Sequence, residues 1–224
     1  HIMKYYAHYG FKDFVISAGA KAHIIKEYFH NYNIYSQNFT KDFSTGEKIV
    51  HDHVDNIDWK VSVIDTGLNT LKGARIKRLE KYIQSDLFHL TYGDGVCDVD
   101  INKLVHFHNS HDCMGSVTAV RPPSRFGELN IDGNNTVLEL EEKPQMGKGL
   151  INGGFFIFNK QMLSYLSEDK NCDFEFGPLQ KIASEGQLKA FKHEGFWQCM
   201  DNVRERNFLN KQVKENTAPW MLWI

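Results

Sequence analysis

The stretch Leu87-Phe-His-Leu-Thr-Tyr-Gly-Asp-Gly95 joins a short apolar run to a carboxylate that lies between two glycines. The run from Leu87 to Thr91 is apolar apart from His89, so it predicts a strand covered on both faces, as in a parallel sheet. Glycines beside Asp94 let the backbone turn and let another molecule approach closely. Because ligands of open α/β sheets bind beyond the carboxyl ends of the strands, Asp94 is the first candidate for a metal or substrate ligand.

Strand and helix patterns alternate on both sides of this stretch. The expected strands lie at 14–18, 59–64, 87–91 and 114–120, and the expected helices at 21–32, 74–83 and 100–111, with Asp100 as the N-cap of the last one. This alternation predicts an α/β fold with a mainly parallel sheet and right-handed crossovers. We expect one domain over residues 1–224, because a chain of 224 residues suits one substantial core.

The pattern changes at both ends of this alternation and after residue 120. Apolar spacing at 1–9, closed by Gly10, predicts a helix, and residues 39–58 predict a hairpin or an excursion from the core. The later segments are an expected hairpin at 126–131 and 136–141, strands at 151–158, 188–191 and 197–200, and helices at 161–166, 174–183 and 203–213. The second part of the chain therefore adds a β-hairpin region to the sheet.

Composition excludes several classes of protein. The chain has 42% hydrophobic and 24% charged residues, which is ordinary for a globular protein. Its net charge of −2 gives no positive electrostatic potential that would attract nucleic acid or an anionic membrane. The four cysteines form no C-x-x-C pair, so we expect neither a zinc knuckle nor a disulfide framework. No apolar run reaches about 18 residues, the length of a membrane-spanning helix. We expect a reduced, cytoplasmic protein.

Two carboxylates share the same situation at the end of an expected strand. Asp94 follows the strand at 87–91, and Asp201 follows the aromatic-rich stretch Phe196-Trp-Gln-Cys-Met200. Such a pair suits Mg²⁺, which takes oxygen ligands and is usually held by one or two carboxylates plus substrate phosphates. Aspartate also favours turns and helix caps, so spacing alone leaves both interpretations open.

Two further segments have an equally open interpretation. Lys143 provides a point charge for a phosphate and Glu142 an acceptor for sugar hydroxyls, unless both belong to a solvated charge cluster. The sequence Asn152-Gly153-Gly154 either brings backbone close to a ligand or forms a bulge.

The histidines do not form a metal site by spacing. His106, His108 and His111 fall on one expected helix but do not share a face as i, i+4 ligands would. Asp98, together with Asp94 and Asp100, is typical of the acidic loop of a metal-dependent glycosyltransferase, although Asp100 suits a helix cap better.

Taken together, short motifs spread along the chain resemble the sugar-phosphate nucleotidyltransferase family, and within it the subfamily that acts on CTP and glucose 1-phosphate. The motifs that carry this resemblance are His1-Ile-Met, Ile64-Asp-Thr-Gly67, Tyr92-Gly-Asp-Gly95, Arg125-Phe-Gly127, Glu142-Lys-Pro144, Ile151-Asn-Gly-Gly-Phe-Phe156, Phe196-Trp-Gln198, Met200-Asp201 and Ala218-Pro-Trp220. Each motif is weak alone, and their order and spacing give them weight.

The resemblance implies a Rossmann-like, GT-A-like fold of the nucleotide-diphospho-sugar transferase type, with a nucleotide-binding part at 1–120 and a sugar-binding part at 121–224. It implies the synthesis of CDP-glucose and diphosphate from CTP and α-D-glucose 1-phosphate, supplying sugars for surface polysaccharide. By the same resemblance, Asp94 and Asp201 hold Mg²⁺, Lys143 meets the sugar phosphate, and Glu142, Gly127 and Asn152 hold glucose hydroxyls. The nucleotide is expected beside Thr66, Gly67, Gly73 and Arg75, and further substrate contacts at Tyr92, Gly93 and Gly153.

The sequence departs from the family in one respect. The family begins with a strand and a glycine-rich G-G-x-G-T-R loop that cradles the triphosphate, and neither motif is present in these 224 residues. We therefore expect no turnover by this chain itself. The alternatives are a non-catalytic module that binds nucleotide sugars and a metal-dependent glycosyltransferase. The resemblance also implies a homo-oligomer, with residues 39–58 and the C-terminal aromatic residues as candidate contacts.

Overall fold

The structure is a computed structural model that describes residues 1–53, 57–123, 128–131, 133–141 and 149–223. The chain divides into two compact units. Unit 1 comprises His1–Gly10, Ser85–Met162 and Leu179–Ile224, and unit 2 comprises Phe11–Gln84 and Leu163–Pro178. Residue 120, at which the expected nucleotide-binding and sugar-binding parts of the domain meet, lies inside unit 1.

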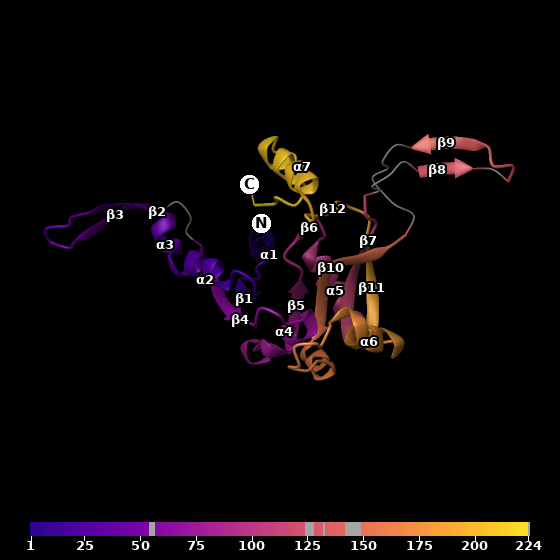
Figure 1. The fold of residues 1–224 in the computed structure, drawn as a ribbon, viewed down its shortest axis with the longest axis horizontal. Helices are drawn as coiled ribbons and strands as arrows, with labels where there is room; N and C mark the ends of the chain where they lie inside the picture. Colours follow the sequence, from indigo (N-terminus) through magenta and orange to yellow (C-terminus); the bar gives the residue numbers. More distant parts are fainter. Residues whose placement is uncertain (54–56, 124–127, 132, 142–148, 224) are drawn as a thin grey trace. The chain divides into compact units, whose positions relative to one another are not determined.

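Unit 1 is built on a four-stranded sheet in the order β11-β7-β10-β5 (Figure 1). Its strands are β5 (Leu87–Thr91), β7 (Gly115–Val120), β10 (Ile151–Asn159) and β11 (Leu188–His193). The strand β11 is parallel to β7, whereas β10 is antiparallel to both of its neighbours. Three strands therefore run in one direction with β10 reversed between them, so the mainly parallel sheet is locally mixed.

The expectation that β5 pairs in a parallel sheet and is covered on both faces is wrong. Its partner is the antiparallel β10, it lies at the edge of the four-stranded sheet, and its five residues are only half-buried. The physical reason is that an apolar run does not report strand direction, and a strand at the edge of a sheet has a neighbouring strand on one side only. The buried run of β10, with Phe156, Ile157 and Phe158 at 0% exposure, takes the central position instead.

Helices pack against this sheet through residues that the sequence pattern identifies. Helix α5 (Ile101–Asn109) buries Leu104, and the side chain of Asp100 accepts a 3.0 Å hydrogen bond from the backbone N–H of Lys103, which confirms the predicted N-cap. Helix α1 (Ile2–His8) is followed by Gly10 at φ +90°, and its Tyr6 stacks on Phe155 of β10. The remaining α-helices of unit 1 are α6 (Gln180–Ser184) and α7 (Val203–Lys214).

Two short antiparallel ladders complete unit 1. The strands β6 (Gly95–Cys97) and β12 (Trp197–Cys199) form one ladder, and β8 (Glu128–Ile131) and β9 (Val137–Glu141) form the other, which confirms the predicted hairpin. The C-terminal segment packs into the unit, because Trp220 is 2% exposed and stacks on Phe196. Trp220 is therefore part of the core of unit 1.

Unit 2 carries a second, two-stranded parallel sheet. Its strands β1 (Asp13–Ala18) and β4 (Lys60–Asp65) pair from Asp13↔Lys60 to Ala18↔Asp65. The connection between them contains α2 (Ala22–His30), α3 (Tyr32–Tyr35) and the antiparallel hairpin of β2 (Gln37–Lys41) with β3 (Lys48–His53). The predicted hairpin at 39–58 is confirmed for its described part.

The remaining helical segments differ from the predicted helices in type or in continuity. The predicted helix at 74–83 is α4 (Lys72–Arg78) followed by the 3₁₀ turn η1 (Glu80–Tyr82). The predicted helices at 161–166 and 174–183 are η2 (Lys160–Tyr165), the kinked η3 (Glu175–Leu179) and α6, and Gly177 and Pro178 lie at the kink. In the part of the chain described here, no helix is long and apolar enough to cross a bilayer.

Candidate active site

The two candidate metal-binding carboxylates lie at the same end of the β6–β12 ladder in unit 1. In this ladder Cys199 pairs with Gly95, and the backbone N–H of Met200 donates a 2.7 Å hydrogen bond to the carbonyl oxygen of Asp94. Asp201 is the next residue, and both aspartates are exposed. The fold therefore brings together two segments that are far apart in the sequence and carries one carboxylate on each.

The start of α7 holds the backbone of Asp201. Asn202 is the N-cap, and its side chain accepts a 3.0 Å hydrogen bond from the backbone N–H of Glu205. The Glu205 carboxylate accepts a 2.7 Å hydrogen bond from the backbone N–H of Asp201. This arrangement is close to a capping box, in which the two side chains satisfy N–H groups that the helix cannot pair. The cap thus fixes the point at which Asp201 leaves β12.

The start of β10 lies beside the end of β5. The Asn152 amide nitrogen is 3.3 Å from the Tyr92 hydroxyl, and the Asn152 amide oxygen accepts a hydrogen bond from the Gly154 N–H at 2.8 Å. The Trp197 indole N–H donates to the Gly153 carbonyl oxygen at 2.8 Å. The pairing register of β10 and β7 shifts between Asn152 and Phe156, so this segment is a bulge, one of the two open interpretations.

Glycines at this edge of the sheet have different environments. A Cβ on Gly153 would lie 2.8 Å from the Val120 side chain and 3.0 Å from the Thr118 carbonyl oxygen, so close packing requires glycine there. A Cβ on Gly93 would meet no atom of the described residues within 4 Å. Gly93, next to Asp94, therefore borders open space.

All four predicted nucleotide contacts lie in unit 2. Thr66 is buried, and its hydroxyl accepts a 2.8 Å hydrogen bond from the Arg75 guanidinium, which also donates to the carbonyl oxygens of Thr70 and Leu68 at 2.7 and 3.1 Å. Gly67 follows at φ +93°. Arg75 thus holds the loop after β4, so that Thr66, Gly67 and Arg75 are brought together. Gly73 faces the backbone of Asp173, where a Cβ would lie 2.5 Å from the carbonyl oxygen.

Three of the predicted site residues, Gly127, Glu142 and Lys143, lie outside the described residues. Tyr92, Gly93, Asp94, Asn152, Gly153 and Asp201 gather in unit 1, whereas Thr66, Gly67, Gly73 and Arg75 belong to unit 2.

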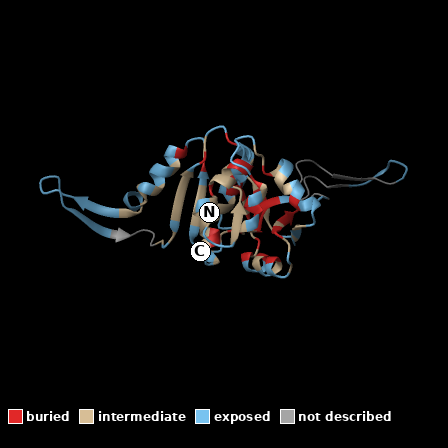
Figure 2. Ribbon diagram, turned by 90° about the horizontal axis from the view of Figure 1, so that it is seen from below, coloured by how far each residue is buried: buried red, intermediate tan, exposed pale blue. Residues whose placement is uncertain are grey.

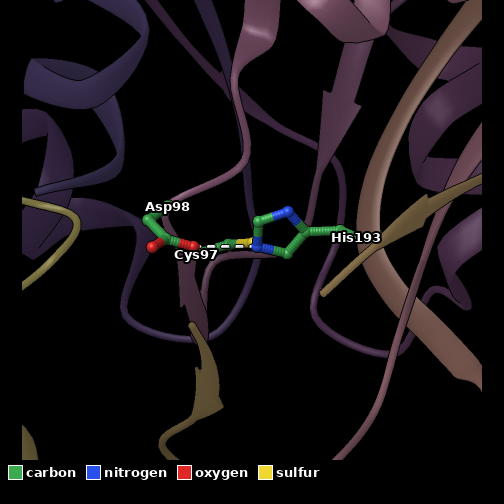
Figure 3. Close-up of side chains that lie close together, drawn as sticks. All are labelled: Cys97, Asp98 and His193. Atoms are coloured by element: carbon green, nitrogen blue, oxygen red, sulfur yellow. Dashed lines mark hydrogen bonds and ion pairs between the residues drawn. The ribbon is translucent and has the colours of Figure 1, made fainter. Parts of the chain in front are cut away.

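Two groups of potential metal-binding side chains occur among the described residues, and in each group the ligand atoms lie within 4.8 Å of one another. They are Cys199, Asp201 and Glu205 in one group and Cys97, Asp98 and His193 in the other. In the second group, His193 Nε2 lies 2.8 Å from an Asp98 carboxylate oxygen (Figure 3), and burial raises the pKa of the Cys97 thiol to about 12. A protonated thiol beside a paired imidazole and carboxylate does not suit Mg²⁺.

The site residues predicted from the sequence did not include His193, Trp197 or Glu205, although Trp197 lies in one of the motifs that carry the family resemblance. The sequence does contain a pattern that points to Glu205. An asparagine such as Asn202, with a glutamate three residues later, is typical of the start of a capped helix. His193 had no local signal, because its partner Asp98 is far away in the sequence.

Comparison with known proteins identifies the family. A family model described as nucleotidyl transferase matches residues 1–202. The chain is 40% identical over 224 residues to the glucose-1-phosphate cytidylyltransferase of Salmonella typhi, and 34% identical over 223 residues to the probable glucose-1-phosphate cytidylyltransferase of Bacillus subtilis. Each match covers 100% of this chain and 86% of the relative. The crystal structure of HddC from Yersinia pseudotuberculosis matches with a TM-score of 0.62 and 25% identity, covering 94% of this chain and 83% of that one.

These findings confirm the nucleotide-diphospho-sugar transferase type of fold and the resemblance to glucose-1-phosphate cytidylyltransferases. They also confirm an enzyme of the nucleotidyltransferase class. With a model match over residues 1–202 and two relatives aligned over its full length, the chain belongs to the nucleotidyl transferase family.

Proposed function

We propose that the active site of this enzyme is built for CTP and α-D-glucose 1-phosphate, whose reaction forms CDP-glucose and diphosphate, with Mg²⁺ held by Asp94 and Asp201. The choice of substrates rests on the names of the two relatives, both glucose-1-phosphate cytidylyltransferases. The choice of metal site rests on one observation, the 2.7 Å hydrogen bond from Met200 N–H to the Asp94 carbonyl oxygen, which supports a shared position for the two carboxylates.

The residues at this end of the ladder fit a magnesium ion. Asp94 and Asp201 are exposed and offer carboxylate oxygens, which are hard ligands, and the remaining coordination positions are available to water and phosphate oxygens. When bound, the ion neutralises the negative charge that gathers on the phosphates during transfer.

The reaction needs positioning more than covalent chemistry. An oxygen of the glucose 1-phosphate attacks the α-phosphorus of CTP, a new P–O bond forms, and the bond to the departing diphosphate breaks, with no covalent bond to the protein. Asp94 and Asp201 fix the end of the site at which the phosphates meet. Asn152 and the Gly153 backbone, held by Tyr92 and Trp197, are the groups that we assign to the glucose hydroxyls. We assign Lys143 to the sugar phosphate, with Glu142 and Gly127 beside the sugar.

We assign the nucleotide to the loop that follows β4. The loop at Thr66 and Gly67 offers backbone groups, and its conformation is held by Arg75. Because the Arg75 guanidinium donates to a hydroxyl and two carbonyl oxygens of this loop, we assign it to shaping the loop for the nucleotide.

We also propose a cytoplasmic homo-oligomer that supplies CDP-glucose for surface polysaccharide. Apolar side chains on α2, α3 and the β2–β3 hairpin support self-association: Phe43 is 92% exposed and Tyr35 is 61% exposed. Figure 2 shows the same segment mostly in pale blue, the colour of exposed residues. A second copy of the chain would remove this surface from water.

Isothermal titration tests the substrate class without requiring turnover. With Mg²⁺ present, CDP-glucose is expected to bind at least about tenfold more tightly than UDP-glucose or GDP-mannose, a difference of about 1.4 kcal/mol. Glucose 1-phosphate is expected to compete with CDP-glucose, since a cytidylyltransferase has a site for the sugar phosphate. Equal affinity for the three nucleotide sugars would contradict the cytidine assignment, and a failure of glucose 1-phosphate to compete would favour a glycosyltransferase.

A further inference from the structure

The β6–β12 ladder carries a different pair of residues at each end. At one end the backbone groups of Asp94 and Met200 are hydrogen-bonded, and at the other end the backbone N–H of Asp98 donates to the Phe196 carbonyl oxygen at 3.1 Å. Only three residue pairs, from Trp197↔Cys97 to Cys199↔Gly95, lie between these ends. A ladder this short is marginally stable on its own. Its order therefore depends on what anchors it to the rest of unit 1.

His193 anchors the far end of the ladder. It is the last residue of β11, where it pairs with Val120 of β7, so its backbone belongs to the four-stranded sheet. Its Nε2 atom lies 2.8 Å from the Asp98 carboxylate (Figure 3). The same atom lies 3.4 Å from the Phe196 carbonyl oxygen. The side chains of His193 and Asp98 are 12% and 28% exposed. A pair this sheltered from water ties both strands of the ladder to the sheet.

The His193–Asp98 pair packs directly against Gly195, in the turn that follows β11. A Cβ on Gly195 would lie 2.5 Å from the Asp98 carboxylate oxygen and 2.7 Å from the Cε1 atom of the His193 ring. Any larger residue at 195 would separate the carboxylate from the imidazole. The hydrogen bond between Asp98 and His193 thus depends on a glycine at position 195.

We propose that Asp98 and His193 are positioning residues for the metal site, because they hold β12 against β6 and so hold Asp201 beside Asp94. This inference rests on the proposed function of Asp94 and Asp201. It assigns no contact between either residue and the substrate. It predicts that breaking the pair at one end of the ladder weakens metal binding at the other end.

The test is isothermal titration of CDP-glucose with and without Mg²⁺, which separates metal-dependent from metal-free affinity. His193→Leu is expected to reduce the Mg²⁺-dependent increase in affinity by about tenfold, while the metal-free affinity changes by less than about twofold. His193→Gln, whose amide can donate to Asp98, is expected to restore most of the increase. Glu194→Gln, at an exposed neighbouring position, is the matched control and is expected to behave as the wild type.

Gly195→Ala provides a second route to the same result, because it separates the pair without removing either partner. An undiminished Mg²⁺-dependent increase in both His193→Leu and Gly195→Ala, with Asp94→Asn abolishing it, would overturn the positioning role and leave the proposed function intact. An equal loss of metal-free and metal-dependent affinity would also overturn it, because that result indicates general loss of structure. An undiminished increase in Asp94→Asn would instead refute the metal site itself.

Discussion

The backbone N–H of Met200 donates a 2.7 Å hydrogen bond to the carbonyl oxygen of Asp94, and this bond closes the β6–β12 ladder at its exposed end. Asp94 follows a strand of the main sheet, whereas Met200 precedes the cap of the last helix. The bond therefore joins the two segments that carry the candidate metal ligands. Changes that disturb either segment are expected to alter metal-dependent binding more than overall stability.

The cap of α7 gives the first prediction. Asn202→Ala removes an N-cap and is expected to lower the free energy of unfolding by about 1 kcal/mol, as in other capped helices. Glu205→Ala also removes the carboxylate that accepts from the Asp201 N–H, so it is expected to weaken Mg²⁺-dependent binding of CDP-glucose as well. Urea denaturation and titration measure the two effects, with the exposed Asn210→Ala as control. Unchanged metal dependence in Glu205→Ala would refute this role.

Two glycines give the second prediction. Gly153→Ala is expected to destabilise the protein by about 1–3 kcal/mol, because a methyl group there overlaps the Val120 side chain. Gly93→Ala is expected to change stability by less than about 0.5 kcal/mol, because its Cβ meets no described atom within 4 Å. It should nevertheless weaken CDP-glucose binding if ligand occupies that space. An unchanged affinity of Gly93→Ala for CDP-glucose would show that the ligand does not occupy the space beside Gly93.

The pH dependence of stability gives the third prediction. Burial lowers the pKa of His89 in β5 from 6.5 to about 4. The unfolded chain therefore takes up a proton near pH 6.5 that the folded chain does not take up until about pH 4, so the free energy of unfolding falls as pH drops through this interval. The expected loss is up to about 3 kcal/mol, at about 1.4 kcal/mol for each tenfold change in proton affinity.

His89→Leu is expected to flatten the pH dependence of stability between pH 6.5 and 4, since leucine has no proton to bind. Urea denaturation at several pH values measures it, and the wild type is expected to lose up to about 3 kcal/mol of stability relative to the variant as the pH falls from 6.5 to 4. Parallel pH profiles for the two proteins would show that His89 is not the cause.

Self-association gives the fourth prediction. Phe43→Ser, at the tip of the β2–β3 connection, is expected to weaken an oligomer measured by sedimentation equilibrium, because Phe43 is 92% exposed in the single chain. Leu138→Ser is the control, since Leu138 is 64% exposed on the β8–β9 hairpin of the other unit. Dissociation by Leu138→Ser alone would move the contact to that hairpin.

Much of the fold could be predicted from local patterns. The strands at 14–18, 87–91 and 151–158, the helix capped by Asp100 and the hairpin at 39–58 all appear close to their predicted positions. Apolar spacing and helix caps involve residues that are close together in the sequence, so these elements can be predicted from the sequence directly. Strand direction is different, because the reversal of β10 depends on what the chain does between β7 and β10, and an apolar run is the same in either direction.

The candidate site was predictable only as a set of residue types. Asp94 is recognisable as a carboxylate that follows a strand, and Asp201 as one that follows an aromatic run. The ladder that brings them together, however, pairs residues about a hundred positions apart in the sequence. Asp98 and His193 are equally far apart in the sequence, so their contact could not be predicted from local patterns. Such contacts follow from the fold as a whole, and no local signal in the sequence reports them.

The central claim is that Asp94 and Asp201 together hold Mg²⁺, and titration of CDP-glucose with and without Mg²⁺ tests it most directly. Asp94→Asn and Asp201→Asn are each expected to abolish the Mg²⁺-dependent increase in affinity and to leave metal-free binding within about twofold. Asp112→Asn, an exposed aspartate elsewhere in unit 1, is expected to change neither quantity. If both Asp94→Asn and Asp201→Asn retained the full Mg²⁺-dependent increase, the proposed metal site would be wrong.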